Sequence, residues 1–246
     1  MRMVGSMTYG RFHWIYNVPL IVLLAGLAQV WDRSWDWWWP ALVVLGIVYA
    51  FTIPWDNYAA YRGIWGFPRE RFSKQIGWLP LEEYLFFGLQ SVQAILLSQL
   101  FLGLWHGLPS GEAVVAWPNL AGCGGILFGW VMVGWVGKRI GSRSRWHYAW
   151  HLLFWFLPIF GLIAVIASSV VAPLWPVWLM TTLVLGTYLT VADLHAISLG
   201  IWHFDARQIS GFRFFGVLPW EEAAFFYLTS ALVSWSYLVL LPGALR

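Results

Sequence analysis

The segment LPLEEYLFFGLQSVQAILLSQLFL, residues 79–102, places two adjacent glutamates at the start of a stretch that is otherwise almost entirely uncharged. A helix needs roughly 20 mostly apolar residues to cross the hydrocarbon core of a bilayer. The segment has this length, so it predicts a transmembrane helix. Glu82 and Glu83 then lie close to one membrane face.

Six further stretches have the same character, and together they predict an all-α integral membrane protein with about seven transmembrane helices. The composition agrees, because 60% of the 246 residues are hydrophobic, 10% are charged and the mean hydropathy is +0.67, outside the usual range of soluble domains. The expected spans are Phe12 to Val30, Pro40 to Tyr61, Leu79 to Leu102, Leu120 to Val136, Tyr148 to Val171, Trp175 to Leu199 and Val217 to Leu240. The fourth is the shortest of them.

The distribution of the basic residues predicts the orientation of these spans. If all seven cross, the N-terminus and every second loop share one side, which carries twelve of the 14 basic residues. These twelve are Arg2, Arg11, Arg62, Arg69, Arg71, Lys74, Lys138, Arg139, Arg143, Arg145, Arg207 and Arg213, whereas Arg33 and Arg246 lie on the other side. Basic residues favour the cytoplasmic side. We therefore expect a multi-pass protein of the cell membrane with a cytoplasmic N-terminus and an external C-terminus.

Three ordered matches indicate an internal duplication. RFHWIYN at residues 11–17 resembles RWHYAWH at 145–151, and GWLPLEE at 77–83 returns as GVLPWEE at 216–222. Between these, the spacing of Asp56, Gly63 and Trp65 recurs in Asp193, Gly200 and Trp202. We expect two parallel three-helix repeats, at residues 1–110 and 144–246, joined by a linker with the fourth helix at 111–143. An offset of four crossings gives both repeats the same orientation, so they can face each other across one cleft.

Six of the eleven acidic residues occupy matched positions at or just inside the ends of apolar helices. They are Asp56, Glu82 and Glu83 in the first half and Asp193, Glu221 and Glu222 in the second. Ionisable groups in a span cost roughly 2.5 kcal/mol or more at the bilayer centre and less near its face, and they usually face the bundle interior. Their number favours a functional role.

Part of this pattern has a purely structural explanation. Pro80 and Pro219 suit the first turn of a helix, where an acid complements the helix dipole. This does not explain why each half has two adjacent glutamates followed by two phenylalanines, namely Phe86 and Phe87, and Phe225 and Phe226. Residues four apart share a helix face, so we expect each carboxyl beside an aromatic ring. A buried acid next to another acid can stay protonated and donate its proton, and ring faces attract a cation.

The tandem Pro-x-Glu-Glu-x-x-Phe-Phe segments, each preceded by a helix that ends in Asp and a Gly-x-Trp, resemble the small membrane lycopene cyclases of the heterodimeric type. That family has two short subunits in some bacteria, one fused chain in archaea, and a fusion to a phytoene synthase domain in fungi. The resemblance covers nearly the whole chain, and each half is similar to one subunit.

The resemblance implies acid-catalysed closure of the ψ ends of lycopene, through γ-carotene to β-carotene, without net redox change. We expect Glu82, Glu83, Glu221 and Glu222 to act as acid and base, Asp56 and Asp193 as second choices, and Phe86, Phe87, Phe225, Phe226, Trp65 and Trp202 to bind substrate. We expect no cofactor, because the Gly-rich run at 122–125 lies inside a span without the strand and turn of a dinucleotide site. No third ligand accompanies His147 and His151, so no metal is expected.

The expected partners are lycopene or another ψ-end carotenoid and the lipid bilayer, and no nucleic acid. Self-association is left open by the sequence. His13, His147, His151 and His195 can relay protons or form interfacial hydrogen bonds, and both alternatives remain open.

Other functions compete with the cyclase. A carotenoid hydratase would quench the same cation with water, and a proton-coupled carrier or a carotenoid-binding membrane protein would also have repeats and buried acids. A retinal-binding photoreceptor needs a lysine in the seventh span, but Lys74 and Lys138 lie in loops. A prenyltransferase needs clustered aspartates for Mg²⁺, which Asp56 and Asp193 do not provide.

Overall fold

The computed structural model describes residues 7–30, 38–105, 120–141 and 144–241. Within these ranges seven helices are long and apolar enough to cross a membrane: Tyr9–Ala28, Trp38–Tyr61, Leu81–Leu104, Ala121–Ile140, His147–Val165, Ala172–Ser198 and Trp220–Leu240. The predicted all-α architecture with about seven transmembrane helices is confirmed. Arg2, Arg33, Arg143 and Arg246, which entered the orientation argument, lie outside the described residues.

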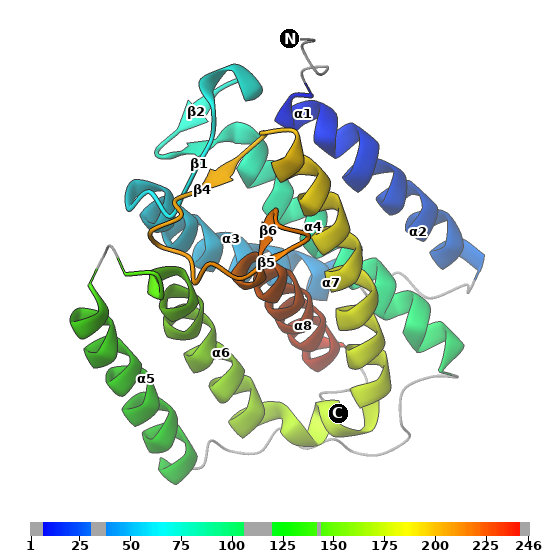
Figure 1. Ribbon diagram of the computed structural model, residues 1–246. Coiled ribbons are helices and arrows are strands. Elements are labelled where there is room, and N and C mark those ends of the chain that lie inside the picture. Colours follow the sequence, from blue (N-terminus) through cyan, green and yellow to red (C-terminus); the bar gives the residue numbers. More distant parts are fainter. Residues whose placement is uncertain (1–6, 31–37, 106–119, 142–143, 242–246) are drawn as a thin grey trace.

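The first half of the chain contains three spans and a loop with short strands (Figure 1). The spans are α1 (Tyr9–Phe12) continued by the π-helical turn η1 (His13–Asn17) and α2 (Val18–Val30), then α3 (Trp38–Tyr61) and α4 (Leu81–Leu104). Between α3 and α4 lie β1 (Trp65–Gly66), the 3₁₀ turn η3 (Arg69–Arg71), β2 (Gln75–Ile76) and β3 (Leu79–Pro80).

The second half has the same order of elements. It consists of α6 (His147–Val171), the 3₁₀ turn η4 (Ala172–Leu174), α7 (Trp175–Ser198) and α8 (Trp220–Leu240). Between α7 and α8 lie β4 (His203–Phe204), β5 (Arg213–Phe214) and β6 (Leu218–Pro219). The remaining helix, α5 (Leu120–Ile140), stands between the halves in the chain.

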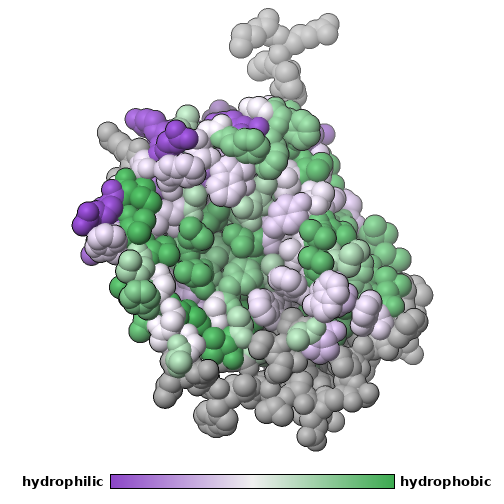
Figure 2. All heavy atoms as spheres, turned by 60° about the horizontal axis from the view of Figure 1, so that its bottom comes forward, coloured by the Kyte–Doolittle hydropathy of each residue, from purple (hydrophilic) through white to green (hydrophobic). Residues whose placement is uncertain are grey.

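Helix α4 lies at the centre of the bundle and α5 at its edge. In the apolar window of α4, 67% of the residues are buried, whereas none are in α5. Helix α4 packs against α2, α3, α7 and α8, while α5 packs against α6, as Figure 1 shows. Figure 2 shows hydrophobic side chains over the middle of one face and the most hydrophilic ones at its edge, which suits a surface that faces lipid.

Local structure repeats in both halves where α3 and α7 end. Gly63 and Gly200 both have φ of 67°, the left-handed conformation that ends a helix. The following residue then donates its N–H back into the helix, from Ile64 to the Ala59 oxygen at 3.0 Å and from Ile201 to the Ala196 oxygen at 3.1 Å. The chain therefore turns back at matched points.

The loops of the two halves pair with each other at this end of the bundle. Strands β1 and β4 are antiparallel, with Trp65 opposite Phe204 and Gly66 opposite His203. Each loop also forms its own hairpin, β2 with β3 and β5 with β6. The hairpins lead into α4 and α8, so they set the direction in which these helices start.

Two side chains at matched positions cap the opposite half. Arg71 donates to the Leu199 oxygen at 3.0 Å, at the C-terminus of α7. Gln208 donates to the Arg62 and Gly63 oxygens at 3.1 and 2.9 Å, at the C-terminus of α3. Carbonyls at a helix end lack partners within the helix, so these contacts both satisfy them and join the halves.

Two sequence expectations differ from the structure in detail. Pro80 and Pro219 precede α4 and α8 in an extended conformation, because they complete the hairpins, and they do not occupy the first helical turn. The first and fifth spans match in a different register as well, since Tyr9 and Tyr148 make equivalent contacts, described below. The similar sequences at residues 11–17 and 145–151 are therefore not structurally equivalent, because the structure aligns the two helices in a different register.

Candidate active site

A cavity of about 30 Å³ lies next to the β1 and β4 pair, where residues from both halves meet. This volume suffices for a water molecule or two. The cavity is lined by Tyr9, Trp55, Asp56, Trp65, Phe67, Glu83, Phe86, Tyr148, Trp202, Phe204, Glu222, Phe225 and Phe226. We call it the acidic pocket, because its polar groups are three carboxyls and two phenols. None of the residues that line it is Lys or Arg.

Three carboxyl groups, Asp56, Glu83 and Glu222, line the acidic pocket, and a fourth, Asp193, lies near them without lining it. Asp56 and Glu83 are close neighbours, and each also interacts electrostatically with Glu222. Asp193 lies next to Glu222 and interacts with Glu83 as well. Neighbouring carboxylates without a cation repel each other strongly in a buried site, so such a group is stable only when protons are shared within it.

Asp56 and Asp193 hold corresponding positions in differing environments. Asp56 is 2% exposed and accepts a hydrogen bond from the Trp65 indole nitrogen at 2.8 Å. Asp193 is 1% exposed and Trp202 lies beside it, but neither carboxylate oxygen has a hydrogen bond of normal geometry within the described residues. The two aspartates therefore occupy equivalent positions in the two halves but differ in their hydrogen bonds.

Each pocket glutamate is held by a tyrosine from the first helix of its own half. The Tyr9 hydroxyl donates to Glu83 Oε2 at 2.8 Å, and the Tyr148 hydroxyl donates to Glu222 Oε2. In both halves the tyrosine precedes its glutamate by 74 residues. A phenol that donates to a carboxyl orients it and stabilises it in the anionic form.

Aromatic rings surround the tyrosines with matched geometry. The Tyr9 ring centroid lies 6.2 Å from that of Phe67, nearly parallel at 13°, and 4.9 Å from that of Trp202. The Tyr148 centroid lies 5.9 Å from that of Phe204, at 15°, and 5.2 Å from that of Trp65. Each tyrosine thus contacts a phenylalanine of its own half and a tryptophan of the other, and the pocket wall is built jointly by the two halves.

The adjacent glutamates of each pair point elsewhere. Glu82 Oε1 accepts the Ser73 N–H at 2.8 Å, and Glu221 Oε1 accepts the Ser210 N–H at 2.7 Å. Both serines lie in the loops before α4 and α8, so Glu82 and Glu221 tie each loop to its helix. Of the four glutamates expected as acid and base, the structure brings Glu83 and Glu222 to the pocket together with Asp56, whereas Asp193 lies near them without lining it.

The expected aromatic residues are divided between two cavities. Phe86, Phe225, Phe226, Trp65 and Trp202 line the acidic pocket. Phe87 lines a neighbouring apolar cavity instead. On α4, Glu83 therefore shares its pocket-facing side with Phe86, three residues later in the sequence. Phe87 lies on a different face of the helix.

Three of the four histidines considered as proton relays have hydrogen bonds near the site. The His13 ring pairs with the Glu82 carbonyl oxygen, His147 with Gln208, and His195 with Tyr16. Neither ring nitrogen of the fully buried His151 has a hydrogen-bond partner within the described residues. Its ring stacks on that of Trp55 at a centroid distance of 5.2 Å and an angle of 13°. None of the four lines the acidic pocket.

Sequence reasoning missed five residues of the pocket: Tyr9, Tyr148, Phe67, Phe204 and Trp55. A signal for four of them was present. The tyrosines stand at the same distance before each Glu-Glu pair, and Phe67 and Phe204 follow Trp65 and Trp202 by two residues. For Trp55 no such signal exists, because Ala192 occupies the corresponding position before Asp193.

The fold and the site together define a class: a multi-pass helical membrane protein in which two similar halves enclose an acidic pocket walled by aromatic rings. The chain is similar to lycopene beta-cyclase of Halobacterium salinarum, with 28% identity over 218 residues that cover 88% of each chain. It is also similar to bifunctional lycopene cyclase/phytoene synthases of Blakeslea trispora (29% identity over 243 residues) and Pyrenophora tritici-repentis (28% over 239 residues). These matches cover 94% and 92% of this chain but 38% and 40% of the fungal proteins.

No protein-family model matches the chain, and no solved structure matches it significantly. The curated relatives are nevertheless consistent with one another, and one of them is matched over nearly its whole length. The resemblance to lycopene cyclases that the paired motifs predicted is therefore confirmed.

Proposed function

We propose that this protein is a lycopene β-cyclase, which converts lycopene through the one-ring γ-carotene to β-carotene. One observation carries the proposal: among the described residues, three carboxyl groups line a pocket whose other walls are aromatic and free of Lys and Arg, and a fourth, Asp193, interacts with them from nearby. The curated relatives named lycopene beta-cyclase support the same activity and an enzymatic role. The substrate is a hydrocarbon dissolved in the bilayer, which suits a site that opens among membrane helices.

The acid cluster supplies the proton that starts the reaction. A protonated carboxyl, Glu83 or Glu222, delivers a proton to the terminal carbon–carbon double bond of a ψ end and leaves a tertiary cation. The tyrosine hydroxyl on each glutamate holds the carboxyl in place and stabilises the carboxylate that remains. Because protons are shared across the cluster, the neighbouring acid can restore the donor after each turnover.

The aromatic wall stabilises the cation and excludes water. Ring faces attract a cation by roughly 2 kcal/mol when the site is desolvated. The internal alkene attacks the tertiary centre and forms the ring, which moves the positive charge to a ring carbon. A carboxylate of the cluster then removes a proton from an adjacent carbon, and the ring double bond forms. One proton is added and one is lost, so the product is an isomer and no redox cofactor is required.

Within this mechanism the six acids have two roles. Glu83, Glu222 and Asp56 belong to the acid and base set because they line the pocket, and Asp193 joins it because it interacts with both pocket glutamates. Glu82 and Glu221 are positioning residues, since each holds the loop before its helix through a backbone N–H. The proposal therefore narrows the four-glutamate set expected from the sequence to one glutamate and one aspartate in each half.

The proposal also includes the origin and orientation of the chain. Matched helix ends, capping contacts and tyrosine pairs support two repeats, at 1–110 and 144–246, with a linker at 111–143. The basic residues Arg62, Arg69, Arg71, Lys74 and Arg207 lie in loops at the pocket end. By the positive-inside rule this end faces the cytoplasm, with the C-terminus on the other side of the cell membrane.

The test is expression in cells that accumulate lycopene, followed by chromatography of the pigments. Conversion to γ-carotene and β-carotene, without added flavin or nicotinamide, is the expected result. The same membranes are probed for the protein, so that its presence is established. Unchanged lycopene in the presence of the protein would refute the cyclase, and a hydroxylated product would identify a hydratase instead.

A further inference from the structure

A second cavity, of about 60 Å³, lies in the bilayer region beside the acidic pocket. Its walls come from α3, α4, α6 and α8 and are almost entirely apolar. They include Val44, Ile47, Phe51, Trp55, Phe156 and Phe225. We call this cavity the apolar cleft. The mechanism above does not use it.

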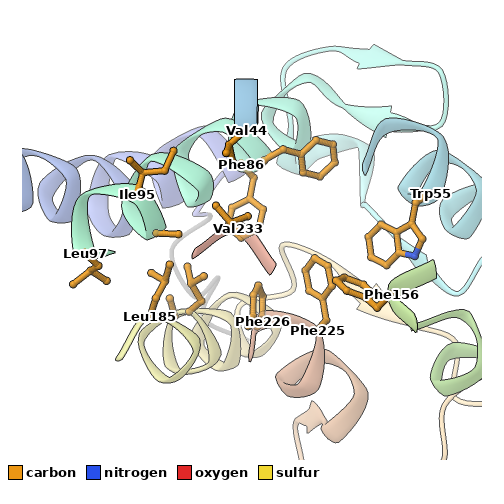
Figure 3. Close-up of a cluster of buried hydrophobic side chains, with 14 of the residues drawn as sticks. Val44, Trp55, Phe86, Ile95, Leu97, Phe156, Leu185, Phe225, Phe226 and Val233 are labelled. Atoms are coloured by element: carbon orange, nitrogen blue, oxygen red, sulfur yellow. The ribbon is translucent and has the colours of Figure 1, made fainter. Parts of the chain in front are cut away.

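The apolar cleft and the acidic pocket share part of their walls. Trp55 and Phe225 line both cavities. Their ring centroids lie 5.1 Å apart with nearly parallel planes, and Phe156 lies 6.2 Å from Trp55 and 6.3 Å from Phe225 (Figure 3). The Trp55 indole nitrogen is buried without a hydrogen-bond partner among the described residues, so no polar contact of the indole fixes this ring. Two aromatic rings therefore separate the cavities.

The cleft extends along the helices and opens toward lipid. Val44 and Trp55 are eleven residues apart on α3, and Phe225 and Ser236 are eleven apart on α8. This separation corresponds to about 16 Å along a helix axis, roughly half of the hydrocarbon thickness. Ile47, at the mouth, is 50% exposed, whereas Val44 is 1% exposed. The cleft therefore runs along the helix axes and has apolar walls, both of which suit an extended hydrocarbon chain.

The corresponding face of the other half is filled. Leu185 and Leu189, which match Val48 and Thr52 by position, are 0% and 2% exposed. Tyr188, which matches Phe51, donates its hydroxyl to the Tyr16 oxygen at 2.6 Å and so binds α7 to the first span. A chain approaching the pocket through these described residues is blocked on that side, although the two halves share one plan.

We propose that the apolar cleft holds the polyene chain of the substrate, and that the end group reaches the acids past Trp55 and Phe225. This inference rests on the proposed cyclase function and names the binding mode of its substrate. Because the pocket is smaller than an end group, these two rings move aside when one enters. The open cleft lies on one side of the pocket, so a symmetric substrate presents its two ends in turn and leaves the cleft between them.

Narrowing the mouth tests this inference. Ile47→Trp places a large ring at the mouth, and Val184→Trp provides the matched control, because Val184 holds the same position on α7 and is 42% exposed to lipid. Expressed in lycopene-accumulating cells at equal protein level, Ile47→Trp is expected to lower conversion about tenfold or more, because the larger ring occupies the mouth through which the polyene chain enters the cleft. Val184→Trp is expected to match the unsubstituted protein. Equal conversion by the two variants would overturn the inference.

A shorter substrate distinguishes an effect on chain binding in the cleft from an effect on the catalytic acids. Ile47 lies eight residues from Trp55, about 12 Å along the helix. An apocarotenoid that keeps one ψ end but whose chain does not reach this depth should be cyclised by Ile47→Trp at nearly the unsubstituted rate. Loss of both activities would mean that the substitution disturbs the acids, which contradicts the assigned role of the cleft.

Binding gives a readout that does not depend on turnover. Lycopene held in an asymmetric cleft acquires induced circular dichroism, which is measured on the purified Glu83→Gln/Glu222→Gln protein. Adding Ile47→Trp should remove this signal, and adding Val184→Trp should preserve it. A signal that survives both additions would refute the binding mode. If the unsubstituted protein leaves lycopene unchanged, the proposed function fails, and the binding measurement still decides on the cleft.

Discussion

The structure predicts opposite outcomes for two adjacent glutamates at the start of α8. Glu222 faces the acidic pocket and accepts the Tyr148 hydroxyl, whereas Glu221 accepts the Ser210 N–H. Glu222→Gln removes the group that we propose exchanges protons with the substrate. A positioned general acid or base contributes roughly 10²- to 10⁴-fold to turnover, which is about 3 to 5 kcal/mol of transition-state stabilisation. We expect the rate of lycopene conversion to fall by this factor.

Glu221→Gln keeps an oxygen that accepts the Ser210 N–H. The substitution preserves this hydrogen bond, so we expect folding free energy to fall by no more than about 1 kcal/mol, the net contribution of one hydrogen bond. We expect turnover within a few-fold of the unsubstituted protein. The assay is pigment chromatography of membranes that contain equal amounts of each variant, determined by immunoblot.

The first half offers an independent replicate. Glu83 and Glu82 have the same division of contacts, with Tyr9 and with the Ser73 N–H. Glu83→Gln and Glu82→Gln should therefore reproduce the contrast, and any difference between the halves shows which of them dominates catalysis. Equal loss of turnover in the two members of a pair, at equal protein level, would refute the assigned roles.

Three further results are expected. Tyr148→Phe removes the hydroxyl that donates to Glu222. Turnover should fall by about 10- to 100-fold, because a hydrogen bond to a charged group contributes about 1.5 to 3 kcal/mol. Steady-state rates at saturating lycopene will measure this, and an unchanged rate would exclude a role for the phenol. Gln208→Ala leaves the Arg62 and Gly63 carbonyls at the end of α3 without their partner and should reduce stability by about 1 to 3 kcal/mol, seen as a lower unfolding temperature in detergent. Hydrogen bonds from Arg207 lower the pKa of Asp205 to about 2, below the value of 3.8 that the carboxyl has in the unfolded chain. The contribution of the Asp205 carboxylate to stability is therefore fully present above pH 3.8 and is lost only as the pH falls through about 2. Asp205→Asn should therefore leave the shape of the pH–rate profile unchanged between about pH 5 and 9, and an altered profile in that range would contradict this assignment.

The spans and the family were predictable because their signals are local in the chain. Apolar length alone determines which segments cross a bilayer, and the expected spans agree with the helices to within a few residues at most ends. The paired Glu-Glu motifs and the Asp to Trp spacing identified the family without any structural information. Each of these signals lies within one helix or one loop, where sequence distance and spatial distance correspond.

The division of labour within each glutamate pair was not predictable in this way. A helical wheel places Glu82 with Phe86 and Glu83 with Phe87, and it does not say which face meets the other half. That choice depends on how α4 leaves its hairpin at Pro80, and the hairpin in turn lies against the loop of the opposite half. Tyr9 was missed for the same reason, because 74 residues separate it from Glu83 and no local pattern links them.

By itself, the amino-acid sequence determined that this chain is an all-α membrane protein with about seven transmembrane helices and six acids near helix ends, and it predicted two similar halves, since hydropathy and motif spacing are properties of single segments. Only the tertiary structure decided that Glu83, Glu222 and Asp56 line one pocket, that Glu82 and Glu221 bind loops, and that one side of the pocket adjoins an apolar cleft. The physical reason is that these relations arise between helices distant in the chain, where packing and paired loops set the direction of each side chain.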